Sequence, residues 1–387
     1  MSRTVVVMLF VCTGCSAGNI IAGADGGGSM NGHGTDGAIG GGGDLASRGG
    51  GGDDGGGPGG GGDLASAAGQ DGGGTTQSGD RFPSSAIWYQ DISNAPLDSE
   101  SATVISGLQA AGGWGTGSLQ IDFSIVVLHA DANVTRRTFT PTGDFYSPDC
   151  DPVPIPVPAG GQVEGSPTND YSCAGSGDCH LIVYQGTRLF EAWVADITGG
   201  QATGGTFSSG CVAAWDLTKD YWQPAAAPNF SRGDQCTSAD AAGYPIAPLL
   251  FYGSELQAGN IDHAIRFILP NARIRDGVYV HPATHSTHPS TKGGPATPPY
   301  GAHLRLNKNF DLSTLPSDAA RTVARALQKY GMFLADGGNI ALTAEASAQQ
   351  YIAADALKLL KVTDFEMVDG GTRIPYTGDC GRTPLSN

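Results

Sequence analysis

The chain is poor in charged side chains, and positive charge is especially scarce. Charged residues make up 15% of its 387 positions, and 21 Lys and Arg stand against 37 Asp and Glu, for a net charge of -16. No Lys or Arg cluster interrupts the part of the sequence that we expect to fold. The negative electrostatic potential of such a protein repels phosphate backbones and anionic lipid headgroups, so the composition argues against nucleic acid as a partner.

Several catalytic and cofactor signatures are also missing. The sequence contains no G-x-S-x-G elbow and no Ser and His spacing typical of a catalytic triad. Its Gly-rich runs follow no strand pattern, so they do not predict phosphate loops. The histidines His281, His285 and His288 superficially suggest a metal, but nearby prolines prevent a helix and only a wrapped loop would bring them together. We therefore expect no cofactor and no metal.

The sequence has no apolar run long enough to stay in a membrane. Residues 1–14 place one arginine before a short apolar stretch that ends in small residues, which predicts a signal peptide. Thr13, Gly14 and Cys15 resemble the lipobox of bacterial lipoproteins, which implies acylation of Cys15 after cleavage; Cys12 fits worse because bulky Val11 precedes it. Ser16 after the cysteine favours the outer membrane, at the cell surface or on the periplasmic face. The lipid would be the only membrane contact.

Large apolar residues are nearly absent from residues 15–80, which hold 28 of the 61 glycines. Such a segment cannot bury enough surface to offset the entropy of ordering, so we predict a disordered tether. The unit GGGGDLAS occurs twice, at residues 40–47 and 59–66, as expected for an expanded low-complexity linker. A Gly-rich coil of about sixty residues spans roughly 40 Å.

Residues 81–387 are predicted to form a single mainly β domain. Short strand-like runs separated by Gly, Pro and Asn favour an antiparallel β-sandwich of jelly-roll type with two late helices, and we expect a monomer. The six cysteines after position 15 allow up to three disulfides, with Cys380 attaching the tail to the body. The predicted strands are residues 121–130, 138–140, 211–217, 261–269, 277–283, 302–310, 332–335 and 364–368, and the predicted helices run from Ser317 to Tyr330 and from Ser347 to Leu360.

The clearest hairpin runs from Gly177 to Trp193, with its turn at 185–186 or at 186–187. Either turn places apolar residues on one face, expected to be core, and polar residues on the other, expected to line a cavity. With the first turn, Asp178 and Glu191 lie diagonally, roughly 7 to 8 Å apart, which suits an inverting glycosidase. With the second turn, His180 faces Trp193 and the two carboxyls are too far apart to share one bond.

Five segments between residues 238 and 336 resemble a family of secreted bacterial proteins with no assigned biochemical role. They are SADAAGYPI, IDHAIRF, YVHPATH, PPYGAHLRL and KYGMFLAD. The resemblance covers most of residues 178–368 and implies a single exported domain, but it supplies no catalytic residue. The Glu-x-Asp-x-x-Glu signature of laminarinase-like jelly rolls is absent.

These patterns lead to one favoured function and two alternatives. We expect a surface-anchored glycoside hydrolase acting on an extracellular polysaccharide, since its chemistry needs two convergent carboxyl groups. The alternatives are a noncatalytic carbohydrate-binding or adhesion lipoprotein and a structural envelope protein. The catalytic candidates are Asp178, Glu191, His180, Asp240 and Asp336, and the substrate-binding candidates are Trp193, Trp215, His281 and Arg266, which could hold the carboxylate of an acidic sugar.

Overall fold

A computed structural model describes residues 80–173, 177–222 and 231–386, all within one compact unit of the chain. The predicted signal peptide, the lipobox at Cys15 and nearly all of the predicted tether lie outside these residues. Within the described part, no helix has both the length and the apolar character needed to cross a membrane.

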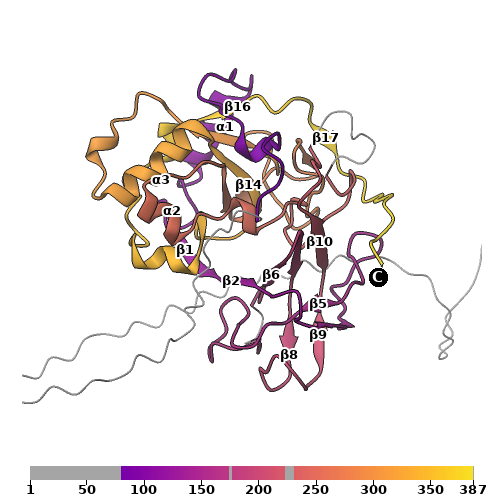
Figure 1. Cartoon of the computed structure of the whole chain (residues 1–387). Helices are drawn as coiled ribbons and strands as arrows, with labels where there is room; N and C mark the ends of the chain where they lie inside the picture. Colours follow the sequence, from indigo (N-terminus) through magenta and orange to yellow (C-terminus); the bar gives the residue numbers. More distant parts are fainter. Residues whose placement is uncertain (1–79, 174–176, 223–230, 387) are drawn as a thin grey trace, which may run out of the picture. The chain divides into compact units, whose positions relative to one another are not determined.

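The larger sheet, which we call sheet A, has six strands and mixes parallel with antiparallel neighbours (Figure 1). The pairs β1–β15 and β11–β14 are parallel, whereas β13 runs antiparallel to both β14 and β16. In sheet order the strands are β1 (Ile121–Ile125), β15 (Leu342–Glu345), β11 (Ile265–Leu269), β14 (Met332–Gly337), β13 (His303–Leu306) and β16 (Phe365–Val368).

The second sheet, sheet B, has four strands and is buried on both faces. Its order is β10 (Val212–Asp216), β7 (Arg188–Ala192), β6 (Leu181–Gln185) and β2 (Val127–His129). Ile182, Tyr184 and Leu189 point into the main core, which also contains the buried residues of sheet A. Their neighbours Val183 and Phe190 belong to a second, smaller core. Sheet B is therefore a layer between two cores.

The predicted strand at residues 121–130 forms two strands in two sheets. Residues 121–125 join sheet A as β1, and residues 127–129 join sheet B as β2. Only Val126 separates them. Burial of Ile121, Ile125, Val127 and Leu128 explains the apolar run, and no Gly, Pro or Asn marks the change of sheet.

Three helices are present in the described residues: α1 (Ser101–Ala110), α2 (Gly253–Ala258) and α3 (Asp318–Lys329). In Figure 1, α1 lies near β16, and the contacts place α3 on β13. The prediction for α3 is confirmed in detail, because the Ser317 side chain caps its first turn and Gly331 follows it with a φ of 69°.

The second predicted helix, from Ser347 to Leu360, is wrong: the region forms only the short 3-10 helix Ala346–Gln350 and turns. Helix α1 was not predicted. The apolar residues whose spacing suggested a helix, Ile352, Leu357 and Leu360, are buried there although the backbone is irregular.

The mainly β class is confirmed, whereas purely antiparallel sheets and the jelly-roll order are not. Parallel pairs occur in sheets A and B and between β4 and β9. The remaining strands form small sheets: β12 (Val278–Tyr279) with β17 (Ile374–Pro375), β3 (Arg136–Arg137) with β5 (Ile155–Pro156), and β4 (Thr140–Pro141) with β9 (Phe207–Ser209) and β8 (Asp196–Ile197).

All six cysteines after position 15 are paired. The disulfides are Cys150–Cys211, Cys173–Cys179 and Cys236–Cys380, so the attachment of the tail through Cys380 is confirmed. Three disulfides are compatible with an extracellular protein.

We expect the Cys236–Cys380 bond to stabilise the fold more than the Cys173–Cys179 bond. The first spans 144 residues and the second 6, and loop-closure entropy gives about 5 against about 2 kcal/mol. Denaturant unfolding of the double Ala variants C236A/C380A and C173A/C179A measures the difference. Equal losses from the two variants would show that loop length does not control the stabilisation.

Candidate functional site

A row of polar side chains crosses four adjacent strands of sheet A. Asp122 on β1 pairs in register with Thr343 on β15, and the next two strands contribute Arg266 from β11 and Asp336 from β14. The register of β11 against β14 shifts between Phe267 and Ile268, opposite Asp336. Bulges of this kind redirect side chains, so the irregularity helps to turn the Asp336 carboxyl toward Arg266.

Arg266 is buried and is held by two carboxylates. Its Nε lies 3.2 Å from Asp240 Oδ1, its Nη2 lies 2.8 Å from the same oxygen, and that Nη2 is also 3.2 Å from Asp336 Oδ2. Its Nη1 donates to Thr343 Oγ1 at 3.4 Å. Burial alone would lower the pKa of Arg266, but Asp240 and Asp336 raise it, so the guanidinium remains charged.

Asp336 combines partial access to solvent with a strongly raised pKa. Its side chain is 26% exposed, whereas that of Asp240 is 0% exposed. Burial, reinforced by the Asp240 charge, raises the pKa of Asp336 to about 7 despite the opposing effect of Arg266. Asp336 is therefore suited to carry a proton near neutral pH.

His180 approaches this row from the start of the sheet B hairpin. Its Nδ1 lies 2.5 Å from Glu164 Oε2, and its Nε2 lies 3.1 Å from the carbonyl oxygen of Ala239, next to Asp240. Burial alone would lower the pKa of His180, but Glu164 raises it to about 9. His180 thus joins the hairpin to the loop that supplies Asp240.

Asp178 and Trp193 lie at the open end of the same hairpin. Asp178 is exposed and accepts a hydrogen bond from Trp193 Nε1 at 3.1 Å, and Trp193 is half-buried. The Asp178 charge acts on both Asp336 and His180, because it contributes to raising the pKa of each. The neighbouring Cys179 and Val194 have φ angles of 45° and 52°, a costly conformation for residues with a side chain.

The structure thus brings together six of the nine sequence-predicted site residues. The five charged members are Asp178, His180, Asp240, Arg266 and Asp336, and with Trp193 we call them the carboxyl cluster.

Glu191 lies apart from the solvent-accessible side of this cluster. The hairpin register pairs Gln185 with Arg188, so the turn is at 186–187 and Glu191 pairs with Ile182, four positions from Asp178. Its side chain is fully buried and accepts hydrogen bonds from Trp215 Nε1 at 3.0 Å and from the backbone N–H groups of Ile246 at 2.7 Å and Ala247 at 2.9 Å. The structure thus has the second of the two turns considered, for which Asp178 and Glu191 are too far apart to share one bond.

The idea that one hairpin face lines a cavity is also corrected. Ile182, Tyr184 and Leu189 fill that face and are buried in the main core. Trp215 is 0% exposed and packs edge-on against Phe82 and Tyr221, so no sugar ring can stack on it. Of the four candidates on that face, Asp178 and Trp193 reach solvent, whereas His180 and Glu191 are buried.

The candidate His281 belongs to a different part of the surface. Its Nε2 lies 2.8 Å from Asp234 Oδ1. The other two histidines of that run have separate partners, with His288 bound to Asp276 and His285 between Ala241 and Tyr376. The run therefore does not converge on one point.

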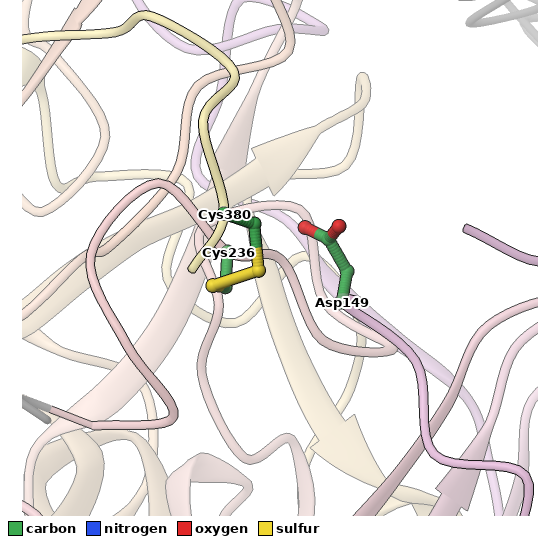
Figure 2. Close-up of side chains that lie close together, drawn as sticks. All are labelled: Asp149, Cys236 and Cys380. Atoms are coloured by element: carbon green, nitrogen blue, oxygen red, sulfur yellow. A yellow bond between two sulfur atoms is a disulfide. The ribbon is translucent and has the colours of Figure 1, made fainter. Parts of the chain in front are cut away.

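One group among the described residues has the spacing of metal ligands, but its chemistry does not suit an ion. Asp149, Cys236 and Cys380 place their ligand atoms within 4.8 Å of one another, and Figure 2 shows the carboxylate beside the Cys236–Cys380 disulfide. Disulfide sulfurs are not the thiolates that metals bind. Asp149 instead accepts a hydrogen bond from the backbone of Thr237 at 2.8 Å.

Sequence reasoning missed Glu164 and Asp122. Glu164 sits in a Gly- and Pro-rich loop, where an isolated acid carries no pattern, and it is brought to His180 only by the fold. Asp122 lies in a mostly apolar predicted strand, where a single acidic residue does not indicate a site. Burial raises its pKa against the Ser124 hydrogen bonds, with Glu164 adding to the effect.

Comparison with protein-family models, with curated proteins and with solved structures gives no match. The function is therefore inferred from the geometry and charge of the carboxyl cluster.

We predict that Glu191 makes the fold less stable as the pH rises from 5 to 7. Burial raises its folded-state pKa to about 7 despite its three hydrogen bonds, whereas an unfolded Glu ionises near about 4.3. Between these values the folded state holds the extra proton, so raising the pH favours unfolding, by on the order of 2 kcal/mol. Asp336 contributes with the same sign.

Denaturant unfolding of wild type and Glu191→Gln at pH 5 and pH 7 measures this effect. The variant should lose less stability over that range than wild type does. Asp369→Asn, at an exposed site, serves as the control and should keep the wild-type slope. A wild-type slope in Glu191→Gln would mean that Glu191 is already ionised at pH 5.

Proposed function

We propose that this chain is a surface-anchored glycoside hydrolase, with Asp336 as the general acid and Asp178 as the general base. The observation that carries this proposal is the contrast between two neighbouring carboxyls. Asp336 is largely buried with its pKa raised to about 7, whereas Asp178 is exposed and bonded to an indole N–H. Two carboxyl groups in such unequal surroundings are what acid and base roles require.

In the proposed reaction, Asp336 gives its proton to the glycosidic oxygen as the bond from that oxygen to the sugar carbon breaks. Asp178 takes a proton from a water molecule, whose oxygen forms the new bond to the same carbon. One water is consumed, and the two carboxyls exchange protonation states until solvent restores them. Trp193, half-buried beside Asp178, offers an apolar ring against which a sugar can lie.

The charge of the cluster favours a neutral glycan over a polyanion. Arg266 was expected from the sequence to bind an acidic sugar, but its donors are engaged by Asp240, Asp336 and Thr343. His180 is likewise engaged by Glu164. The carboxylate of an acidic sugar would therefore meet Asp178 with no uncommitted cation from Arg266 or His180.

The anchoring part of the proposal rests on the sequence alone. A lipid on Cys15 and a Gly-rich tether would keep the enzyme at the outer membrane while letting it reach a polysaccharide. Its disulfides are compatible with such a location. The noncatalytic binding module remains the alternative, since it would use Trp193 without needing the carboxyls.

The test is release of reducing ends from a panel of neutral and acidic polysaccharides by the full chain. Asp336→Asn and Asp178→Asn should each lower kcat/KM by about 10²- to 10⁴-fold, since each removes one proton-transfer partner. Asp369→Asn should keep full activity. Binding of a glycan without any release of reducing ends would favour the noncatalytic module and contradict the proposal.

The pH dependence gives an independent check on Asp336. A general acid must start protonated, so kcat/KM should fall as the pH rises through about 7, where Asp336 ionises. Activity that rises through this range would exclude Asp336 as the acid.

A further inference from the structure

Both ring nitrogens of His180 face hydrogen-bond acceptors. Nε2 is 3.1 Å from the carbonyl oxygen of Ala239, which can only accept, and Nδ1 is 2.5 Å from Glu164 Oε2. A neutral imidazole has a single N–H and can satisfy only one acceptor, whereas an imidazolium satisfies both. The contacts of His180 therefore match its charged form.

The surroundings of Glu164 favour the carboxylate. Ser124 donates to Oε1 at 2.8 Å, and the backbone N–H of His180 donates to Oε2 at 3.3 Å. Burial alone would raise the pKa of Glu164, but His180 lowers it to about 2. The backbone N–H of Glu164 also donates to the carbonyl of His180 at 2.9 Å, which fixes the two residues against each other.

We propose that Glu164 is a positioning residue that keeps His180 permanently cationic. The charged groups that act on His180 are Glu164, Asp178 and Arg266. His180 then has a permanent positive charge and acts neither as general acid nor as general base. The role in catalysis rests on the proposed hydrolase function; the charge state does not.

Two other histidines, His285 and the buried His263, provide internal comparisons. His285 has the Ala241 carbonyl at 2.8 Å from Nδ1 and the Tyr376 hydroxyl, which can donate, at 2.9 Å from Nε2, so a neutral ring satisfies both. His263 has two acceptors, Ala264 O at 2.7 Å and Glu255 Oε1 at 3.1 Å, as His180 does. The charged groups acting on His263 are Glu255 and Arg81, and none belongs to the carboxyl cluster.

The experiment is nitrogen-15 NMR of the histidine rings in the full chain, with His180 assigned as the signal lost in His180→Gln. Wild-type His180 should show two protonated nitrogens at pH 7.5. Glu164→Gln should leave the ring neutral at that pH, and Glu164→Asp should restore the charge. Thermal unfolding checks that each variant is folded. A neutral His180 in wild type, or a charged one in Glu164→Gln, would overturn the proposal.

The matched control is Glu255→Gln, which removes the partner of His263 and should leave both nitrogens of His180 protonated at pH 7.5. A His180 ring that becomes neutral in Glu255→Gln would show that Glu164 does not set its charge.

A wild-type chain that releases no reducing ends would contradict the hydrolase function alone, because the NMR experiment measures the charge of His180 without any reaction.

Discussion

The buried charge of Arg266 is the constraint on which the rest of the site depends. A guanidinium cannot shed its proton to escape a dry environment, so the fold must surround it with acceptors. Asp240 provides the main pairing, and Asp336 and Thr343 complete it. The loop that carries Asp240 is held in turn by the hydrogen bond from Ala242 N–H to the carbonyl of Ala335, one residue before Asp336. One cation thus fixes the positions of the loop and of three strands of sheet A.

This arrangement also explains why the two carboxyls on Arg266 are not equivalent. Asp240 is fully buried and makes the closer contacts, so its negative charge is the one that balances the guanidinium. Asp336 makes one longer contact and feels the Asp240 charge as repulsion, and it is the group with the raised pKa. Of the two acids that share the Arg266 cation, Asp240 therefore has a structural role and Asp336 can exchange a proton.

The sequence identified much of the site's membership but little of its geometry. Strand patterns and turn residues were enough to find the hairpin at 177–193 and helix α3, because local backbone preferences decide both. Strand parity placed Asp178 and Glu191 on one face, and the turn at 186–187 sets them four strand positions apart. That face was expected to line a cavity, but sheet B is buried on both faces, so Glu191 reaches Trp215 and the backbone at 246–247 and not solvent. Glu164 could not be predicted, since its meeting with His180 depends on a loop path that no periodicity encodes.

The single residue between β1 and β2 has a mechanical consequence. Asp122 stands on the sheet A side of Val126, and β2 on the other side pairs directly with β6, whose preceding residues are Asp178, Cys179 and His180. A linker of one residue limits how far β1 and β2 can separate, so Asp122 and the start of β6 are tied to each other through a short stretch of backbone.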